Sequence, residues 1–208
     1  NVSRRSFIQT TAAATVGLGV AGSASLQAQG ANDRIVLAVI GTNGRGAQHA
    51  KMFSRMPGVE VGFICDPEEK ALAKGLKAVS PDQAHAAKAE RDFRRALEQK
   101  DLDAVVIAAP DHWHAKIGID CANAGMDIYG EKPFAWGLAE GRALVNALKK
   151  NKRVWQTGCW QRSDGYFRRF NALIDNNTLG KLTRLECGTP SGMSIREHAP
   201  QDQWPSMI

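Results

Sequence analysis

The strongest constraint on the fold is an apolar run at residues 34–40 that leads directly into a glycine-rich turn at residues 41–46 and then into a helix. A continuous run of Ile, Val, Leu and Ala is typical of a strand covered on both faces, as in a parallel sheet. The helix is expected to continue to about Met56, where Pro57 and Gly58 stop it.

The same alternation of apolar runs and helical stretches recurs along the chain. Further strands are expected at residues 59–65, 103–109, 126–129 and 153–157, with a short one near Phe93. Further helices are expected at residues 67–79, 93–100, 114–124 and 138–151. Repeated β-α units predict an α/β protein with a Rossmann-type, doubly wound parallel sheet and right-handed crossovers, occupying residues 32–158.

The texture of the sequence changes after Gly158. An amphipathic helix is expected at residues 166–176, and the alternating residues 181–187 could be a strand of a new sheet. A single strand with unpaired edges cannot stand alone. We therefore expect residues 159–208 to be the truncated start of a second, incomplete α/β domain for substrate binding and oligomerisation.

The first residues have the pattern of a targeting signal. Residues 3–8, Ser-Arg-Arg-Ser-Phe-Ile, resemble the twin-arginine export signal, and an acid-free Ala/Gly-rich run and a small-residue cleavage site near Ala28 follow. The alternative is a frayed Ala-rich tail. We expect residues 1–31 to be a twin-arginine signal peptide, with the translocation machinery as partner and the periplasm or another exported location as destination.

Charge and cysteine content exclude some classes of function. The net charge is +6, but basic and acidic residues are mixed along the chain, which favours a solvated surface over a nucleic-acid-binding face. The four cysteines are far apart and form no Cys-x-x-Cys pair, so zinc and redox motifs are not expected. Buried free thiols are the default reading, although an exported protein could form a disulfide.

The glycine turn predicts dinucleotide binding. In the G-x-G-x-x-G fingerprint the glycines allow a tight turn, close approach of the backbone to the pyrophosphate, and packing of helix on strand. Here Gly41 and Gly46 hold the outer positions, and Asn43, which tolerates left-handed backbone angles, holds the middle one. The residues expected to bind the cofactor at this turn are Gly41, Asn43, Gly44, Arg45 and Gly46.

Asp66 at the end of the second strand supports this prediction. A carboxylate there can accept hydrogen bonds from the adenosine ribose hydroxyls and would repel a 2′-phosphate, which favours NAD over NADP. Arg45 and Lys70 are close enough in sequence to leave NADP open. Asp66 could also simply cap the helix that starts at Pro67.

Two further motifs follow predicted strands, at the strand ends that border the ligand crevice of such a sheet. In the first, His112 and His114 are two residues apart with no third His or Cys nearby, so packing against the cofactor is favoured over a metal site. In the second, Lys132 has a flexible, charged side chain that can polarise a substrate hydroxyl or pass a proton. Glu131 could hold this lysine or contact the nicotinamide ribose, and the alternative is a surface ion pair.

These motifs together resemble the Gfo/Idh/MocA oxidoreductases, over about residues 34–188. The segments that carry the resemblance, in the family's order and spacing, are Gly41-x-x-Gly44-Arg45-Gly46, Cys65-Asp66-Pro67, Pro110-Asp111-His112-Trp113-His114, Glu131-Lys132-Pro133 and Thr157-Gly158-Cys159-Trp160-Gln161-Arg162-Ser163. The resemblance implies a nucleotide-binding domain followed by an α/β domain with a large open sheet, through which members form homo-oligomers. It also implies NAD or NADP as cofactor and a sugar or polyol as substrate.

The resemblance assigns roles to individual residues. It implies that Lys132 is catalytic and touches both substrate and nicotinamide, and that Asp111, His114, Glu131, Gln161 and Arg162 line the cofactor. It further implies a general acid/base histidine in the second domain, for which the sequence offers no match, because His198 lies in a region without likeness to the family.

Three functions remain open from the sequence. The first is an exported oxidoreductase that transfers a hydride between a nicotinamide cofactor and a sugar or cyclitol hydroxyl. The second is a glycosidase of the same fold that uses tightly held NAD, and the third is a nucleotide-binding protein without catalysis. Sugar release without accumulation of NADH would separate the second from the first, and turnover with and without Lys132→Ala would separate the third.

Overall fold

The structure is a computed structural model that describes residues 34–184 and residue 186. The predicted twin-arginine segment and the stretch from residue 190 to residue 208 lie outside these residues. Within the described part, no helix is both long enough and apolar enough to cross a lipid bilayer.

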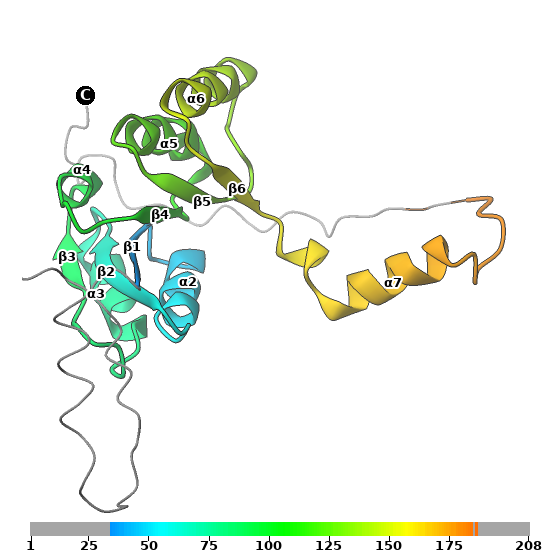
Figure 1. Cartoon of the computed structure of the whole chain (residues 1–208), viewed down its shortest axis with the longest axis horizontal. Helices are drawn as coiled ribbons and strands as arrows, with labels where there is room; N and C mark the ends of the chain where they lie inside the picture. Colours follow the sequence, from blue (N-terminus) through cyan, green and yellow to red (C-terminus); the bar gives the residue numbers. More distant parts are fainter. Residues whose placement is uncertain (1–33, 185, 187–208) are drawn as a thin grey trace, which may run out of the picture. The chain divides into compact units, whose positions relative to one another are not determined.

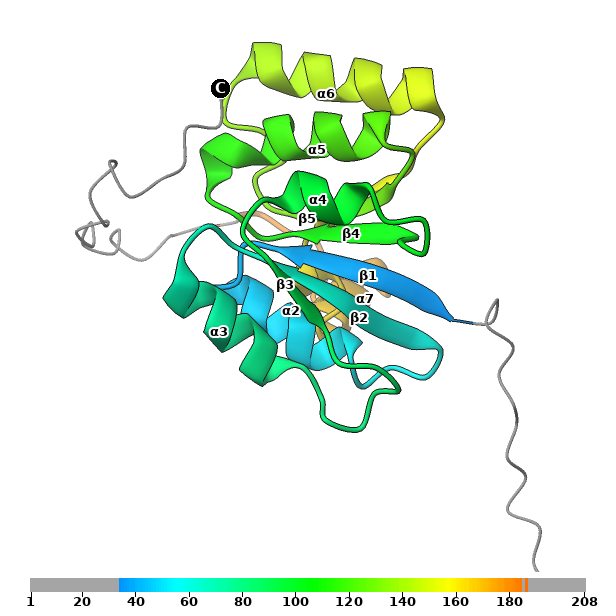
Figure 2. The same ribbon diagram turned by 90° about the vertical axis from the view of Figure 1, so that its left-hand side faces the viewer.

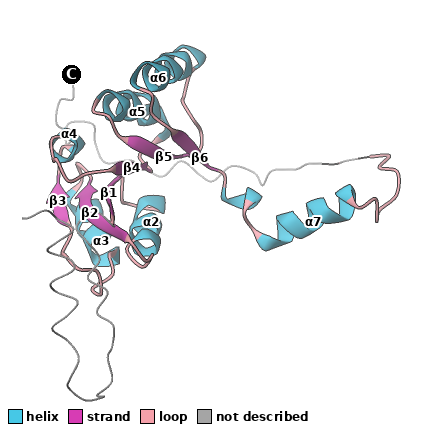
Figure 3. Ribbon diagram, viewed as in Figure 1, coloured by secondary structure: helices cyan, strands magenta, loops and turns pink. Residues whose placement is uncertain are grey.

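A six-stranded sheet forms the centre of the described part, and every pair of neighbouring strands is parallel. Its order is β3-β2-β1-β4-β5-β6, and helices alternate with strands along the chain (Figure 3). The strands are β1 (Ile35–Ile40), β2 (Val59–Cys65), β3 (Lys88–Glu90), β4 (Ala104–Ile107), β5 (Asp127–Glu131) and β6 (Trp155–Gly158). The predicted doubly wound parallel sheet is confirmed.

Helices cover both faces of this sheet (Figures 1 and 2). The covering helices are α2 (Arg45–Phe53), α3 (Glu69–Ala78), α4 (Phe93–Leu97), α5 (His114–Asn123) and α6 (Leu138–Asn151). Helix α7 (Gly165–Asp175) follows β6 along the chain and has no buried residue. Helices α2 and α3 bury Ala50 and Leu72 in a core with Val39 of β1. Helices α4, α5 and α6 contribute to a larger core on the opposite face, where Ile117 and Leu144 pack with residues of β1, β2, β4 and β5.

One predicted strand is confirmed and one is wrong. The short third strand expected near Phe93 is β3, an edge strand without an apolar run, which pairs with the end of β2. Phe93 itself starts α4, as expected, and the Asp92 side chain accepts a hydrogen bond from the Arg94 N–H and caps that helix. Residues 181–184 form no strand, and residues 185 and 187 of the same prediction lie outside the described part.

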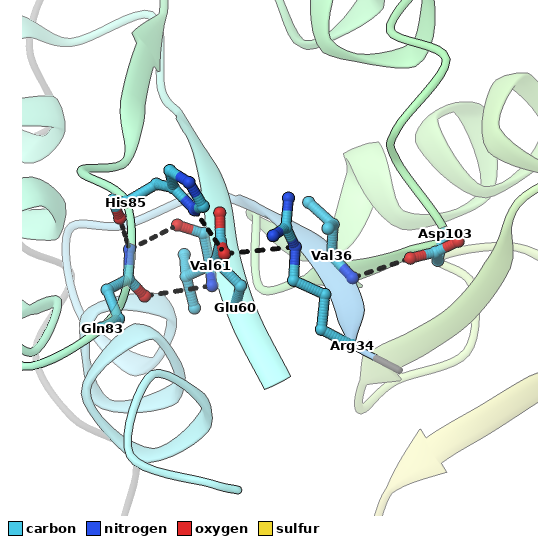
Figure 4. Close-up of polar contacts among 7 residues, drawn as sticks. All are labelled: Arg34, Val36, Glu60, Val61, Gln83, His85 and Asp103. Atoms are coloured by element: carbon cyan, nitrogen blue, oxygen red, sulfur yellow. Dashed lines mark hydrogen bonds and ion pairs between the residues drawn. The ribbon is translucent and has the colours of Figure 1, made fainter. Parts of the chain in front are cut away.

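Side chains tie the strands together at their amino ends, away from the glycine turn (Figure 4). The Gln83 amide donates to the Val61 carbonyl and accepts from the Val61 N–H, so this side chain takes the place of a strand partner beside β2. The Asp103 carboxylate accepts from the N–H of Val36 at 2.8 Å. The side-chain contacts at this end of the sheet therefore stabilise the fold.

Three of the four cysteines lie in the described part, and all three are free thiols. Cys65 and Cys121 are buried, as predicted, and burial raises the pKa of both thiols far above the ordinary value. The expectation of burial is wrong for Cys159, which is exposed because it lies just beyond the end of β6.

Candidate active site

The strand register brings the predicted site residues to one edge of the sheet. Ile40 at the end of β1 pairs with Cys65 of β2 and with Ile107 of β4, and Glu131 of β5 pairs with Gly158 of β6. The segments that follow these strands therefore start side by side. They contain the glycine turn, Asp66, residues 108–114, Lys132 and residues 159–162.

The glycine turn is tightly packed at both of its outer positions. Gly41 has a φ of +84°, and a Cβ atom built on it would lie 2.5 Å from the backbone nitrogen of Ala109. A Cβ atom on Gly46 would lie only 1.8 Å from the carbonyl oxygen of Gly41. Only glycine fits either position, so the N-terminus of α2 can lie close to the end of β1.

The outer surface of the same turn is open. Asn43 and Gly44 are exposed, and a Cβ atom on Gly44 would meet no atom within 4 Å. Asn43 does not use the left-handed backbone region, so the turn does not depend on that property of asparagine. The Lys74 ammonium donates to the carbonyl of Asn43 and places a positive charge beside the turn. Open backbone at a helix N-terminus, next to a cation, fits the pyrophosphate of a dinucleotide.

Asp66 is a buried carboxylate that connects two turns. One of its oxygens accepts from the N–H of Thr42 at 2.7 Å, and the other accepts from the N–H of Glu68 at 3.0 Å. Burial raises the pKa of Asp66 above its ordinary value, although these backbone hydrogen bonds oppose the shift. The Oδ2 atom also accepts from the Thr42 hydroxyl at 3.5 Å, whereas Oδ1 keeps a second lone pair that a ribose hydroxyl could use. Asp66 also organises the turn before α3, whose cap position is held by Glu68.

His114 is buried, with 1% of its surface exposed. Its Nδ1 lies 2.5 Å from the Pro133 carbonyl oxygen, and its Nε2 lies 2.9 Å from the Ala109 carbonyl oxygen. The residue therefore bridges the segment after β4 to the segment after β5. That His114 also lines the cofactor stays a prediction.

The neighbours of His114 are more accessible. Asp111 lies in a short 3-10 helix (Asp111–Trp113), where it is half-buried, and His112 is exposed. Within residues 34–184, no three His, Cys, Asp or Glu side chains lie close enough together to hold a metal ion. Asp111 stays a predicted cofactor contact.

Glu131, the last residue of β5, is buried in a polar cluster. Its Oε1 atom accepts a hydrogen bond from Arg45 Nε at 2.9 Å and lies 2.7 Å from His49 Nε2. Burial alone would raise the pKa of Glu131, but the hydrogen bonds from Arg45 and His49 outweigh it and hold the pKa below 4.5. Glu131 is thus held by two residues of α2 and does not serve as the partner of Lys132.

His49 is a site residue that the motifs did not single out. Burial lowers its pKa below 6.5, against the opposing effect of the Glu131 hydrogen bond. The neutral ring carries one N–H, and because a carboxylate can only accept, that proton lies on Nε2. A sequence signal did exist: His49 is four residues after Arg45, so both side chains lie on the same face of a helix.

Lys132 and the segment after β6 provide the remaining predicted residues. Lys132 is exposed, and its amine makes no hydrogen bond or ion pair with the residues in the range 34–184. Gln161 and Arg162 are exposed in a second 3-10 helix (Trp160–Arg162). The structure brings this segment close to Glu131, since a Cβ atom on Gly158 would lie 3.0 Å from the Glu131 carboxylate. The contacts of Gln161 and Arg162 with a cofactor stay predictions.

Comparison with proteins of known sequence shows relatives of two kinds. The chain is 29% identical over 172 residues to a glycosyl hydrolase family 109 protein of Saccharopolyspora erythraea, covering 73% of this chain and 38% of that protein. It is 27% identical over 168 residues to an uncharacterized oxidoreductase, YrbE, of Bacillus subtilis, covering 81% of this chain and 46% of that protein. The chain thus spans less than half the length of these relatives.

Solved structures show the same fold. A scyllo-inositol dehydrogenase from Lactobacillus casei, solved with bound NAD(H) and scyllo-inositol, has a TM-score of 0.63 at 21% identity, covering 72% of this chain and 43% of that one. A myo-inositol 2-dehydrogenase from Lactobacillus plantarum has a TM-score of 0.63 at 22% identity, covering 71% and 43%.

The model of one protein family matches residues 35–159, which is more than half of the chain. That family is described as an oxidoreductase family with an NAD-binding Rossmann fold, and its matched range contains the glycine turn, Asp66, Glu131 and Lys132. The chain belongs to the Gfo/Idh/MocA family of NAD-binding oxidoreductases.

Proposed function

We propose that the protein transfers a hydride between NAD and a hydroxyl-bearing carbon of a sugar or cyclitol. The observation that carries this proposal is the position of Lys132. It follows the last residue of β5 at the sheet edge that also holds the glycine turn and Asp66, and its amine is exposed there. Membership in an NAD-binding oxidoreductase family supports the cofactor, and the inositol dehydrogenases of the same fold support the substrate class.

In the proposed reaction, the cofactor and the protein have separate roles. Bound NAD⁺ supplies the acceptor for the hydride, which carries two electrons away from the alcohol carbon. The hydroxyl proton must leave separately as the ketone forms. Lys132 is placed to polarise this hydroxyl and pass its proton on, whereas Glu131 is engaged by Arg45 and His49.

A turnover assay with Lys132→Ala tests the proposal. The protein from the complete reading frame that contains this sequence is incubated with NAD⁺ and a panel of cyclitols and aldoses, and NADH absorbance is followed. We expect Lys132→Ala to lower kcat about 100- to 10,000-fold, the range for loss of a proton-transfer group, and to leave NADH binding in place. Lys149→Ala, on exposed α6 surface, is the matched control. Equal turnover in both variants would contradict the role of Lys132.

A second candidate is hydrolysis of a glycoside by a cycle that begins and ends with oxidised NAD. The glycosyl hydrolase family 109 relative, at 29% identity, favours it. In this cycle the hydride removed from the sugar returns to it, so NADH does not accumulate. Sugar release from a panel of chromogenic glycosides, without NADH accumulation, would support this candidate over the net oxidoreductase.

We also propose that the protein is exported by the twin-arginine route. The support is the sequence of residues 3–8 and the acid-free run that follows. Cell fractionation of the native protein and of the double variant Arg4→Lys, Arg5→Lys tests it. The native protein is expected outside the cytoplasm and the variant inside, and retention of both in the cytoplasm would overturn the proposal.

A further inference from the structure

The two residues on either side of Lys132 are each held by a buried histidine. His49 Nε2 lies 2.7 Å from the Glu131 carboxylate, and His114 Nδ1 lies 2.5 Å from the Pro133 carbonyl oxygen. Both histidines are 1% exposed. They come from helices on opposite faces of the sheet, since His49 belongs to α2 and His114 to α5 (Figures 1 and 2).

Burying the His49 ring costs free energy that a purely apolar side chain would not. The ring packs edge-on against Tyr129, at 5.3 Å between centroids, and near Phe53 at 5.9 Å. Its Nδ1 atom is buried and has no hydrogen-bond partner among the described residues. An aliphatic side chain of similar volume would fill this position without an unsatisfied polar atom. The feature that a leucine could not supply is the hydrogen bond to Glu131.

Arg45 extends the arrangement to the glycine turn. Its Nε donates to the Glu131 oxygen that also receives His49, and Arg45 is the first residue of α2, directly after Gly44. Glu131, the residue directly before Lys132, is therefore linked through Arg45 to the turn that fits the pyrophosphate. The His114 bridge to the Ala109 carbonyl adds a link to the segment after β4.

We propose that His49 and His114 are positioning residues for Lys132, which they hold at a fixed place relative to the dinucleotide by anchoring Glu131 and the Pro133 carbonyl. The inference rests on the proposed function, because Lys132 is the proton-handling residue in that proposal. A displacement of about 1 Å at a reacting group can cost about 100-fold in rate, so anchors that fix the position of Lys132 matter for turnover.

Conservative substitutions at His49 test the first anchor. His49→Gln keeps an N–H donor near the Nε2 position, whereas His49→Leu removes it at similar volume. We expect His49→Leu to lower kcat by up to about 100-fold with KM for NAD⁺ changed less than about 3-fold. His49→Gln should retain kcat to within about 3-fold of the native value.

A matched pair tests the second anchor. His114→Asn keeps a donor near the Nδ1 position, which faces the Pro133 carbonyl, and His114→Gln keeps one near Nε2, which faces Ala109. Retained kcat in His114→Asn and lowered kcat in His114→Gln are expected. The opposite order, or equal kcat in the two variants, would overturn the role of the Pro133 contact.

A measurement that needs no turnover separates this inference from the proposed function. Competitive acylation followed by mass spectrometry gives the reactivity of Lys132 relative to Lys149 in the same molecule, with NADH bound. Binding of NADH, followed by fluorescence, identifies folded variants, and His85→Gln, at the amino ends of the strands, is the control.

This measurement gives different results when the positioning role is wrong and when the proposed function is wrong. A changed Lys132 reactivity in His49→Leu, with native reactivity in His49→Gln, supports the positioning role even if no sugar is oxidised. Absence of sugar oxidation by itself would contradict only the proposed function. Equal Lys132 reactivity in the two His49 variants overturns the positioning role even if the protein oxidises a cyclitol.

Discussion

Gly46 packs directly against Gly41 at the start of the first β-α unit. A Cβ atom on Gly46 would lie 1.8 Å from the Gly41 carbonyl oxygen and 2.9 Å from its carbonyl carbon. These neighbours are backbone atoms, which cannot move aside as the end of a side chain can. The contact brings the N-terminus of α2 to the end of β1, where backbone N–H groups can face a phosphate.

Gly46→Ala is therefore expected to destabilise the fold by about 1–3 kcal/mol, the usual cost of forced overpacking, and to weaken NADH binding. Gly137→Ala, directly before α6 and outside the turn, is the control, because Gly137 has an extended backbone and a Cβ atom there meets nothing within 4 Å. Thermal unfolding and calorimetric titration with NADH measure both effects. Indistinguishable melting temperatures and affinities in the two variants would show that the turn is not packed as described.

Asp66→Asn is expected to act on both stability and cofactor choice. Asn has one side-chain oxygen, so either the Thr42 N–H or the Glu68 N–H loses its acceptor, at a cost of about 1–3 kcal/mol. Loss of the negative charge should raise the affinity for NADPH relative to NADH. Titration with both cofactors checks this, with exposed Asp101→Asn as control. An NADH preference as strong as in the native protein would argue against a ribose contact at Asp66.

The pair of His49 and Glu131 should make the fold sensitive to acid. The folded-state pKa of His49 lies below 6.5, so the unfolded chain takes up its proton first and stability falls as the pH drops below that value. The pKa of Glu131 lies below 4.5, so its contribution is present above that pH and is lost as the pH falls through the folded-state pKa. Both shifts have the same sign.

Comparison with His49→Gln isolates the histidine, because Asp66, whose raised pKa acts in the opposite sense, is present in both proteins. The melting temperature of the native protein should fall more steeply than that of the variant between about pH 7 and about pH 5. Parallel curves would mean that His49 is not buried in its neutral form.

The cysteines should differ sharply in reactivity. Cys159 is exposed, whereas Cys65 and Cys121 are buried with their thiol pKa values raised. Alkylation of the native protein, mapped by mass spectrometry, should modify Cys159 and leave the other two unmodified until denaturant is added. Rapid modification of Cys65 without denaturant would contradict the packing of β2 in the core.

Strongly periodic segments could be predicted from the sequence, and short edge segments could not. Helix α6 was expected at residues 138–151 and begins and ends there, since its apolar positions repeat at helical spacing. Strand β3 has only three residues and lies at the sheet edge, with two of its residues exposed, so no apolar pattern marks it. Only pairing with β2 defines that strand.

In the candidate site too, some features could be predicted from the sequence and others could not. The glycine turn and Asp66 are read from sequence because backbone geometry restricts the residue types that fit. The partner of Glu131 could not be read in this way. Lys132 is adjacent in sequence, but it lies just beyond the end of β5, and the carboxylate instead meets Arg45 and His49, more than 80 residues earlier. Such contacts depend on how α2 packs on the sheet.

Calorimetric titration of the purified chain with NADH and NAD⁺ tests the central claim most directly. We predict saturable heat with one dinucleotide per chain, abolished or strongly weakened in Gly46→Ala and retained in Gly137→Ala. Absence of heat with either form of the cofactor, from protein that melts cooperatively, would contradict a dinucleotide site at the carboxyl ends of these strands.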